Sequence, residues 1–421
     1  MGGENRKAAM RPNSAIPDTG VAWTLFITLA IQAMAAMSAV TVPVFAPVAS
    51  GDLGVSLAYL GVFTGLVYVG GMVGAVTSID LILRDGPIRV SQYCLILCGA
   101  GLAVTSSGSL PLMIPGALLI GMGYGAVTPA SSHILAKSAP PHLMALTFSI
   151  KQTGVPIGGA MAGAVVPPLV LLIGWKGVPL VVGGTCVLLA VLAERTRGTL
   201  DTDLRKDHRL SFGGIMEPVK MVFALPPIRR LALMSFFFAA LGVVLTTYFV
   251  SFLTTSLDLS LVEAGLTLTV ALTAGVVGRI LWGWIADRSV DPMRMLGILG
   301  IVMAVSAGAT VAFTRSWPYA ALIFVSALFG GTAQGWNGLF LAEVARQAPK
   351  GMEGAATGGT LFFTFFAGMI APVCFSAVAG AGHNYSFAYL VFSVPVFLFG
   401  LLLVRGAENR AGPPSHPPRA V

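Results

Sequence analysis

Charged side chains are scarce in this sequence. Asp, Glu, Lys and Arg make up 10% of its 421 residues, whereas 56% of the residues are hydrophobic. An ordinary soluble domain is roughly 25% charged. So little polar surface excludes a soluble protein of this size, and the abundance of Leu, Val, Phe and Ile excludes a disordered chain. The composition therefore indicates a protein that crosses a lipid bilayer many times.

Cysteine is scarce as well, and the motifs of the common catalytic sites are missing. The four cysteines, Cys94, Cys98, Cys186 and Cys374, all fall in apolar runs. Neither a histidine nor a carboxylate lies beside the first two to complete a metal site. The sequence has no GxxxxGK[ST] nucleotide loop, no HExxH and no GxSxG. These absences predict that the protein is not an enzyme and uses neither a metal nor a cofactor.

The net charge of +8 does not by itself indicate a nucleic-acid partner. Nucleic-acid-binding proteins gather Lys and Arg on one solvated face, but here the cations are scattered between apolar runs. That pattern is typical of the basic loops of a membrane protein. We therefore expect the lipid bilayer, and not nucleic acid, as the partner.

Apolar runs divide the chain into two sets of six. A spanning helix needs about 20 apolar residues. The runs lie at about 21–49, 57–82, 89–107, 111–136, 143–172 and 177–193, and again at about 230–254, 262–286, 294–313, 317–343, 354–380 and 385–404. We predict an all-α integral membrane protein with twelve transmembrane helices in two six-helix bundles, at residues 21–193 and 230–405. A charged linker, 194–229, joins the bundles, and residues 1–20 and 406–421 form tails.

The distribution of Lys and Arg predicts how these helices are oriented. Of the 25 cations, 21 fall in segments that are cytoplasmic if both termini are cytoplasmic, whereas only Lys176 and Arg315 fall in the opposite loops. Cytoplasmic loops carry an excess of Lys and Arg. The tails and the linker are therefore predicted to be cytoplasmic, in a multi-pass, monomeric protein of the cell (inner or plasma) membrane.

Short matches relate the two halves of the sequence. Gly71-Met-Val-Gly74 matches Gly275-Val-Val-Gly278 at an offset of 204 residues, which also places Arg84 on Arg288. Matches at equivalent places in the helix count predict two halves related by a parallel pseudo-repeat. A substrate site near the middle of the membrane, between the halves, follows from that architecture.

Three segments carry a resemblance to a known family. They are GVVGRILWGWIADR at 275–288, the loop RDGPIR at 84–89 and GVPIGGAMAG at 154–163. Over nearly its whole length the chain resembles the major facilitator superfamily of secondary transporters, whose loop motif between the eighth and ninth helices is similar to GWIADR. The first-half loop departs from that motif at Leu83, where the family has an aspartate. Val155 likewise breaks the Gly-Pro pair of the family's antiporters.

The resemblance implies gating and conformational roles for four loop residues, Arg84, Asp85, Asp287 and Arg288. Small residues at helical spacing let helices approach closely and slide. Bending of the fifth helix is therefore predicted near Gly154, Pro156, Gly158 and Gly159. Together these features favour a moving carrier over a rigid pore.

Within the superfamily, the position of Arg279 eight residues before Asp287 resembles the monocarboxylate-transporter and oxalate–formate antiporter branch. In that branch the eighth-helix arginine binds the substrate carboxylate. The oxalate–formate type also carries a lysine on its eleventh helix. Here that helix has no lysine, and the deep lysine, Lys151, is on the fifth helix instead.

Lys151 and Arg279 are the two cations that fall inside apolar runs. Each lies about eight residues from a helix end, roughly 12 Å deep at the rise of an α-helix. A charge at that depth is hydrated, paired or functional, and none of the 17 acids lies deep in an apolar run. We predict that the substrate supplies the anion, bound by the fork of Arg279 and the point charge of Lys151 across a central cavity. Alternatively, Lys151 packs between helices and its amine snorkels to water.

Other polar and aromatic residues fall at similar depths. Those able to hydrogen-bond to a substrate in the cavity are Gln32, Gln334 and Asn337, with Trp336 beside them as a wall. Those farther out, able to close the extracellular side over the substrate, are Tyr68, Tyr124 and Tyr248. For each of them a helix–helix contact or an interfacial aromatic is the alternative interpretation.

These observations predict a secondary active transporter that moves a small organic anion, a mono- or dicarboxylate, by alternating access. The chain has no deep carboxyl group to carry a proton. Anion exchange is therefore one mechanism, and proton-coupled symport, with Lys151 or His133 titrating, is the other. The alternative function is an antiporter-type exporter of drugs or other neutral or amphiphilic metabolites. Two deep cations disfavour cationic cargo.

Overall fold

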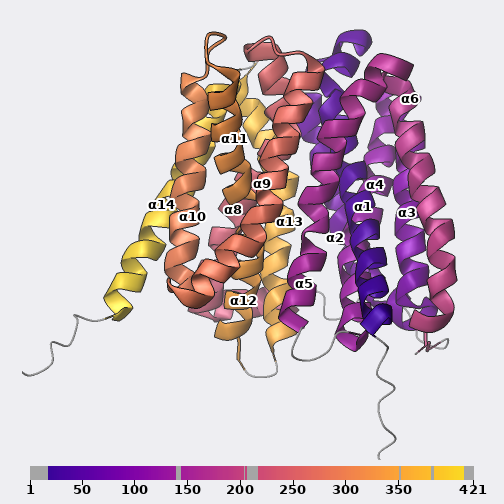
Figure 1. Ribbon diagram of the computed structural model, residues 1–421, viewed down its shortest axis with the longest axis vertical. Coiled ribbons are helices and arrows are strands. Elements are labelled where there is room, and N and C mark those ends of the chain that lie inside the picture. Colours follow the sequence, from indigo (N-terminus) through magenta and orange to yellow (C-terminus); the bar gives the residue numbers. More distant parts are fainter. Residues whose placement is uncertain are drawn as a thin grey trace, which may run out of the picture.

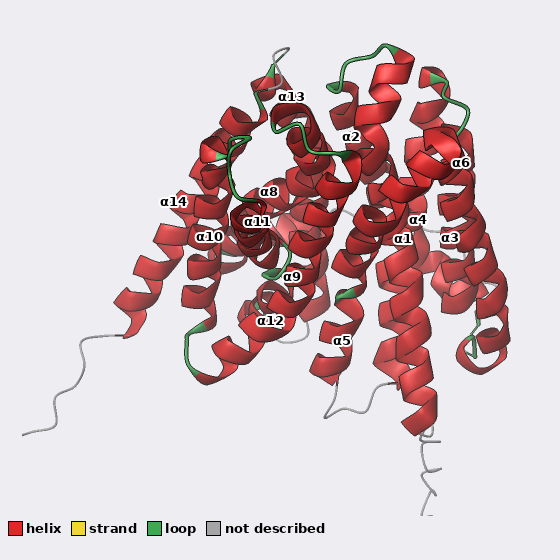
Figure 2. Cartoon of the chain, turned by 45° about the horizontal axis from the view of Figure 1, so that its top comes forward, coloured by secondary structure: helices red, strands yellow, loops and turns green. Residues whose placement is uncertain are grey.

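Helices account for nearly all of the chain that the structure describes. The computed structural model describes residues 18–138, 144–202, 204–205, 217–349, 352–380 and 384–411, and within those ranges it contains helices, turns and loops but no strand (Figure 2). Most of both predicted tails, and residues 206–216 of the predicted linker, lie outside these ranges.

The first half contains six helices. They are α1 (Asp18–Leu53), α2 (Tyr59–Asp85), α3 (Pro87–Thr105), α4 (Leu110–Ser138), α5 (Met144–Gln152) and α6 (Gly154–Leu200). Gly174, with a φ of 72° and a ψ of 159°, interrupts α6 and separates two spans. A residue with a side chain would be strained at that positive φ, so the glycine makes the reversal between the fifth and sixth spans possible.

The second half begins with a short helix, α7 (Glu217–Ala224). It continues with α8 (Pro226–Ser256), α9 (Leu261–Arg288), α10 (Pro292–Gly308) and the 3₁₀ turn η2 (Ala309–Ala312), followed by α11 (Tyr319–Ala333), α12 (Asn337–Gln347), α13 (Glu353–Ala379) and α14 (Tyr385–Ala411). A capping box of Ser260 and Glu263 starts α9, and Asp291 caps α10 through the N–H groups of Met293 and Arg294. Such caps satisfy N–H groups that a helix start leaves free.

The described helices account for twelve membrane spans. Ten segments are long and apolar enough to cross a membrane, and one of them, Thr147–Leu200, contains both spans that Gly174 separates. The twelfth span is α11 and α12 together, of 15 and 11 residues, neither of which is long enough alone. The two sets of helices stand side by side in Figure 1. The predicted fold class, twelve transmembrane helices in two six-helix bundles, is confirmed.

Two spans that we predicted as single apolar runs are interrupted. The run at 143–172 is broken at Thr153, between α5 and α6, and the run at 317–343 is broken between α11 and α12. Pro156 explains the first break in part, because proline has no N–H to donate to the carbonyl of Gln152, four residues earlier. Hydropathy does not detect such a break, because the flanking residues stay apolar.

The two halves meet mainly along three pairs of helices: α1 with α8, α2 with α13, and α6 with α9. A hydrogen bond of 3.1 Å from Thr269 Oγ1 on α9 to the carbonyl of Ala160 on α6 joins the last pair. The central space between the halves is thus bounded by helices of both.

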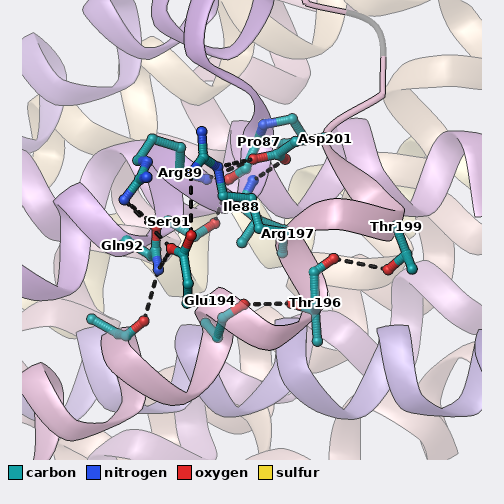
Figure 3. A network of polar contacts seen from close by, with 12 residues as sticks. Pro87, Ile88, Arg89, Ser91, Gln92, Glu194, Thr196, Arg197, Thr199 and Asp201 are labelled. Carbon is teal, nitrogen blue, oxygen red and sulfur yellow. Dashed lines mark hydrogen bonds and ion pairs between the residues drawn. The ribbon is translucent and has the colours of Figure 1, made fainter.

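A polar network ties the end of α6 to the turn between α2 and α3 (Figure 3). The carboxylate of Asp201 accepts hydrogen bonds from the backbone N–H groups of Ile88 (2.8 Å) and Arg89 (3.1 Å), at the start of α3. Glu194 accepts one from Gln92 Nε2 (2.8 Å). Burial raises the pKa of the Asp201 carboxyl, although its two N–H donors act in the opposite direction. Asp201 therefore caps a helix that begins 114 positions earlier in the chain.

Replacing Asp201 by alanine is expected to lower the free energy of unfolding by about 1–2 kcal/mol, because α3 loses the acceptor for its first N–H groups. Asp201→Asn keeps a side-chain oxygen and should retain most of this stability. The melting temperatures of both variants in detergent check the prediction. An equal loss in the two variants would contradict a capping role.

Candidate substrate-binding site

A cavity of about 920 Å³ lies between the two halves. Helices α1, α2 and α4–α6 line it from the first half, and α8, α9, the α11–α12 break and α13 line it from the second. The lining continues to Asp80 near the end of α2, to Pro218 in α7 and to Gly358 near the start of α13. The cavity therefore reaches the end of the molecule at which α2 ends and α13 begins.

The opposite end of the central space is closed by packed side chains. Tyr248 on α8 donates a hydrogen bond of 3.0 Å to the carbonyl of Pro372 on α13, and its ring stacks on Phe375 with centroids 4.9 Å apart. Gly61 on α2 lies against this pair. Tyr248 does not line the cavity. Its position fits the predicted closing role, which stays a prediction.

Arg279 on α9 lines the cavity and is 8% exposed. Its Nε donates to the carbonyl of Gln334 at 2.8 Å, and its Nη1 donates to the carbonyl of Gln152, in the other half, at 2.5 Å. Both carbonyls lie at helix breaks, and Pro156 leaves that of Gln152 without its usual helical donor. The breaks in the fifth and tenth spans thus create the acceptors that hold the guanidinium.

The guanidinium has no anionic partner in the described part of the chain. No carboxylate pairs with Arg279 there, and its Nη2 forms no hydrogen bond to a described residue. Backbone carbonyls orient the group but leave its full positive charge uncompensated. A buried charge of this kind is costly unless an anion joins it.

Lys151 lies beside this site but does not line the cavity. It is wholly buried on α5, and its Nζ contacts the carbonyl of Thr128 at 3.4 Å and Oε1 of Gln152 at 3.3 Å. We expected the two cations to face each other across the cavity. Instead, Arg279 reaches across to α5, and Gln152 and Thr128 lie between Lys151 and the cavity. A direct contact of Lys151 with substrate stays a prediction.

The predicted amides divide into two groups. Gln334 and Asn337 line the cavity, and Trp336 forms part of its wall with its ring against Phe238. Gln32 is buried outside the lining, where its Oε1 accepts from Thr128 Oγ1 at 3.1 Å. Its Nε2 has no partner among the described residues. Gln32 therefore belongs with Lys151 in a polar cluster behind the wall.

Aromatic rings form the wall of the cavity beside the guanidinium. Tyr68 on α2 packs edge-on against Tyr124 on α4 and Phe365 on α13, with centroids 6.4 and 6.0 Å apart. Tyr124 lies close enough to Arg279 to interact with it electrostatically. Phe362 and Phe365 also line the cavity and were not predicted, although four phenylalanines within 362–366 indicate an aromatic face on this helix.

The predicted gating residues of the two loops have different partners. Arg84 and Asp85 form a bidentate pair with each other, at 2.9 and 3.0 Å. The guanidinium carbon of Arg288 lies 4.5 Å from the centroid of Trp284. The side chain of Asp287 lies outside the described residues. A gating role for these four residues stays a prediction.

The predicted bending residues lie where α6 meets its neighbours. Gly154 packs against Gln32, Gly158 against the carbonyl of Ala33 on α1, and Gly159 against Leu272 on α9. The three glycines therefore lie in the contacts of α6 with α1 and α9, just after the break at Thr153. These contacts would slide if the two halves moved relative to each other. A bending role for these residues stays a prediction.

Known proteins share this sequence pattern and fold. Residues 25–372 and 235–420 match the Major Facilitator Superfamily. The gentisate transporter of Corynebacterium glutamicum is 23% identical over 367 residues, covering 84% of this chain and 78% of the relative. A probable hexose phosphate transport protein of Chlamydia muridarum is 22% identical over 404 residues, covering 88% of each. The benzoate transport protein of Acinetobacter baylyi is 23% identical over 391 residues, covering 84% and 80%.

Solved structures share the fold over almost the whole chain. A bacterial homologue of the human lysosomal transporter Spinster, in an inward-facing conformation, has a TM-score of 0.72 at 16% identity, covering 94% of this chain and 99% of the other. A D-xylose–proton symporter has a TM-score of 0.73 at 16% identity, covering 90% and 96%. At this identity the likeness establishes the fold alone.

Proposed function

The chain belongs to the Major Facilitator Superfamily, and from that premise we propose that it carries a small organic anion, preferably an aromatic carboxylate, by alternating access. The three relatives compared above are named for gentisate, hexose phosphate and benzoate, all of which are anions. Gentisate and benzoate are aromatic carboxylates. The chemistry of the cavity supports the same class.

The observation that carries the proposal is the uncompensated guanidinium of Arg279. It is nearly buried, it lines the cavity, and neutral carbonyls fix its orientation. A carboxylate binds such a planar group through two parallel hydrogen bonds. Binding would also relieve the cost of a buried charge, so an anion should be preferred over neutral or cationic cargo.

The aromatic wall supports a substrate that carries a ring. A single aromatic ring whose carboxylate reaches Arg279 would lie beside Tyr68, Tyr124 and Phe365, where edge-on and offset ring contacts are favourable. Gln334 and Asn337 offer amides to polar substituents on that ring. An aliphatic acid would keep the charge contact and lose the ring contacts.

Replacing Tyr68 by alanine is expected to reduce the preference for benzoate over acetate about fivefold, because one favourable ring pair is worth roughly 1 kcal/mol. The preference is measured as the ratio of the concentrations of acetate and benzoate that halve the uptake of a labelled substrate. Tyr59, an exposed tyrosine on the same helix, provides the matched control Tyr59→Ala and should leave the preference unchanged. Equal effects of the two variants would contradict a specific role for the Tyr68 ring.

We also propose that the termini and the linker 194–229 are cytoplasmic, and that residues 21–193 and 230–405 form the two bundles of a cell-membrane protein. The split of 21 cations against two supports this orientation. The cavity then opens to the cytoplasm, because it reaches the end at which α2 ends.

Counterflow in proteoliposomes tests the function directly. Vesicles loaded with unlabelled benzoate should accumulate labelled benzoate from outside. In a competition panel, aromatic acids should inhibit this uptake most, dicarboxylates and hexose phosphate less, and a lipophilic cation least. Transport of the lipophilic cation, with no response to any anion, would establish the exporter alternative and overturn the proposal.

A further inference from the structure

Lys151 is a buried cation without an anionic partner in the part of the chain that the structure describes. It is 0% exposed, and its two contacts, to Thr128 at 3.4 Å and Gln152 at 3.3 Å, are near the outer limit of a hydrogen bond. Arg279 lies close enough to act on it electrostatically. Two positive groups therefore share this region, and the described residues supply no counter-ion.

The titratable groups around Lys151 lie on the helices that pack against α5. Helix α5 packs against α1, α4, α6 and α9. Their titratable and charged residues are Asp18 and Asp52 on α1, Tyr124, His133 and Lys137 on α4, Lys176, Cys186, Glu194, Arg195 and Arg197 on α6, and Glu263, Arg279, Asp287 and Arg288 on α9. Among those of them whose side chains the structure describes, Arg279 is the residue whose charge acts on Lys151.

The two cations differ in what they can do during a cycle. A guanidinium keeps its proton at any physiological pH, whereas a lysine amine can lose its proton when its surroundings change. Two like charges held together without an anion are costly in a low-dielectric site. Of the pair, only Lys151 can change its charge to relieve that cost.

Gln152 connects the two groups. Its backbone carbonyl accepts from Arg279 Nη1 at 2.5 Å, and its side-chain Oε1 contacts Lys151 Nζ at 3.3 Å. Gln152 and Thr128, the two contacts of the amine, both line the cavity. The amine is therefore one residue away from the cavity and from the guanidinium.

We propose that Lys151 is the proton-coupling group of the carrier. A carboxylate bound to Arg279 supplies the negative charge that stabilises the ammonium form of Lys151. When the carboxylate leaves, the amine releases its proton to the same solution. One proton and one monocarboxylate then cross together, without net charge. The proposal rests on the proposed carboxylate transport and selects symport over exchange.

The first experiment uses the wild-type protein in proteoliposomes that contain a pH-sensitive dye. An inward pH gradient of one unit should drive accumulation of benzoate into anion-free vesicles by about tenfold, the limit for one proton per carboxylate. Internal acidification should accompany it. Counterflow without any acidification would overturn the proton proposal and leave carboxylate transport intact. If the wild-type protein showed neither counterflow nor gradient-driven accumulation of benzoate, the proposed function itself would be contradicted.

The second experiment assigns the proton to Lys151. Lys151→Met should keep benzoate counterflow and lose gradient-driven accumulation, and Lys151→Arg, which cannot release its proton, should do the same. His133→Gln is the matched control for the other titratable candidate and should keep both activities. Gradient-driven accumulation in Lys151→Met overturns the proposal.

A third variant serves if neither substitution of the lysine folds. Gln152→Ala leaves Lys151 in place and removes one of its two contacts. It should shift the pH profile of uptake relative to the wild type. An unchanged profile counts against Lys151 as the coupling group.

Discussion

Replacing Arg279 by alanine is expected to reduce carboxylate uptake by about a hundredfold or more. Removing one partner of a buried, hydrogen-bonded charge pair costs roughly 2–5 kcal/mol, and about 2.8 kcal/mol already corresponds to that factor. The substitution also removes the bonds to the Gln152 and Gln334 carbonyls. Counterflow measures the loss of transport, and substrate-induced thermal stabilisation measures the loss of binding.

Arg279→Lys separates the charge from the shape of the guanidinium. Lysine keeps a positive charge but cannot bind both carboxylate oxygens through a planar fork. It should therefore recover part of the binding and little of the transport. Arg230→Lys, at an exposed arginine near the start of α8, is the matched control and should stay near wild type. Full transport of every carboxylate tested by Arg279→Lys would refute bidentate recognition.

Replacing Gly61 by leucine is expected to abolish uptake while leaving substrate binding measurable. A Cβ at this position would lie 2.5 Å from the Tyr248 hydroxyl and 2.6 Å from the Pro372 carbonyl oxygen. The latter is backbone, so the closed end of the central space could not pack as it does here. The carrier should then be held with that end open.

Cysteine labelling reads out this shift. With the exposed Cys374 replaced by serine, a reporter at Thr247→Cys, which lines the cavity, should react with an impermeant maleimide from the closed side only in the Gly61→Leu protein. Gly51→Leu is the matched control, because a Cβ at Gly51 meets no atom within 4 Å. Equal labelling of both variants would show that Gly61 does not govern closure.

The sequence was sufficient to predict the features that depend on position along a helix. The helix count follows from hydropathy, and the importance of Arg279 follows from its depth and from the lack of any acid at that depth. The rotation of a helix about its axis, which decides the side chains that face the cavity, could not be predicted in the same way. Lys151 has the predicted depth, yet its side chain lies behind Gln152, because the pattern of small and apolar residues around it does not specify which face meets the cavity.

Contacts between distant segments were also beyond prediction from the sequence. Nothing local marks Asp201 as the cap of α3, since a helix cap is recognised by sequence proximity and Ile88 is 113 residues away. The break after Gln152 has a local signal in Pro156, but only the fold shows that Arg279 uses the carbonyl that this proline leaves free. Phe365 joins Tyr68 only because α13 packs on α2.

The size of the cavity has a kinetic consequence. At about 920 Å³ it lies near the upper end for small-molecule sites and is far larger than a single-ring acid. A cargo of that size buries only part of its surface while the cavity is open, so much of its hydration persists and it dissociates quickly. Fast dissociation is an advantage to a carrier, whose turnover would be limited by slow escape of a tightly held cargo. The affinity that selects an aromatic acid should therefore develop mainly as the walls close around it, and be largely lost again when they part.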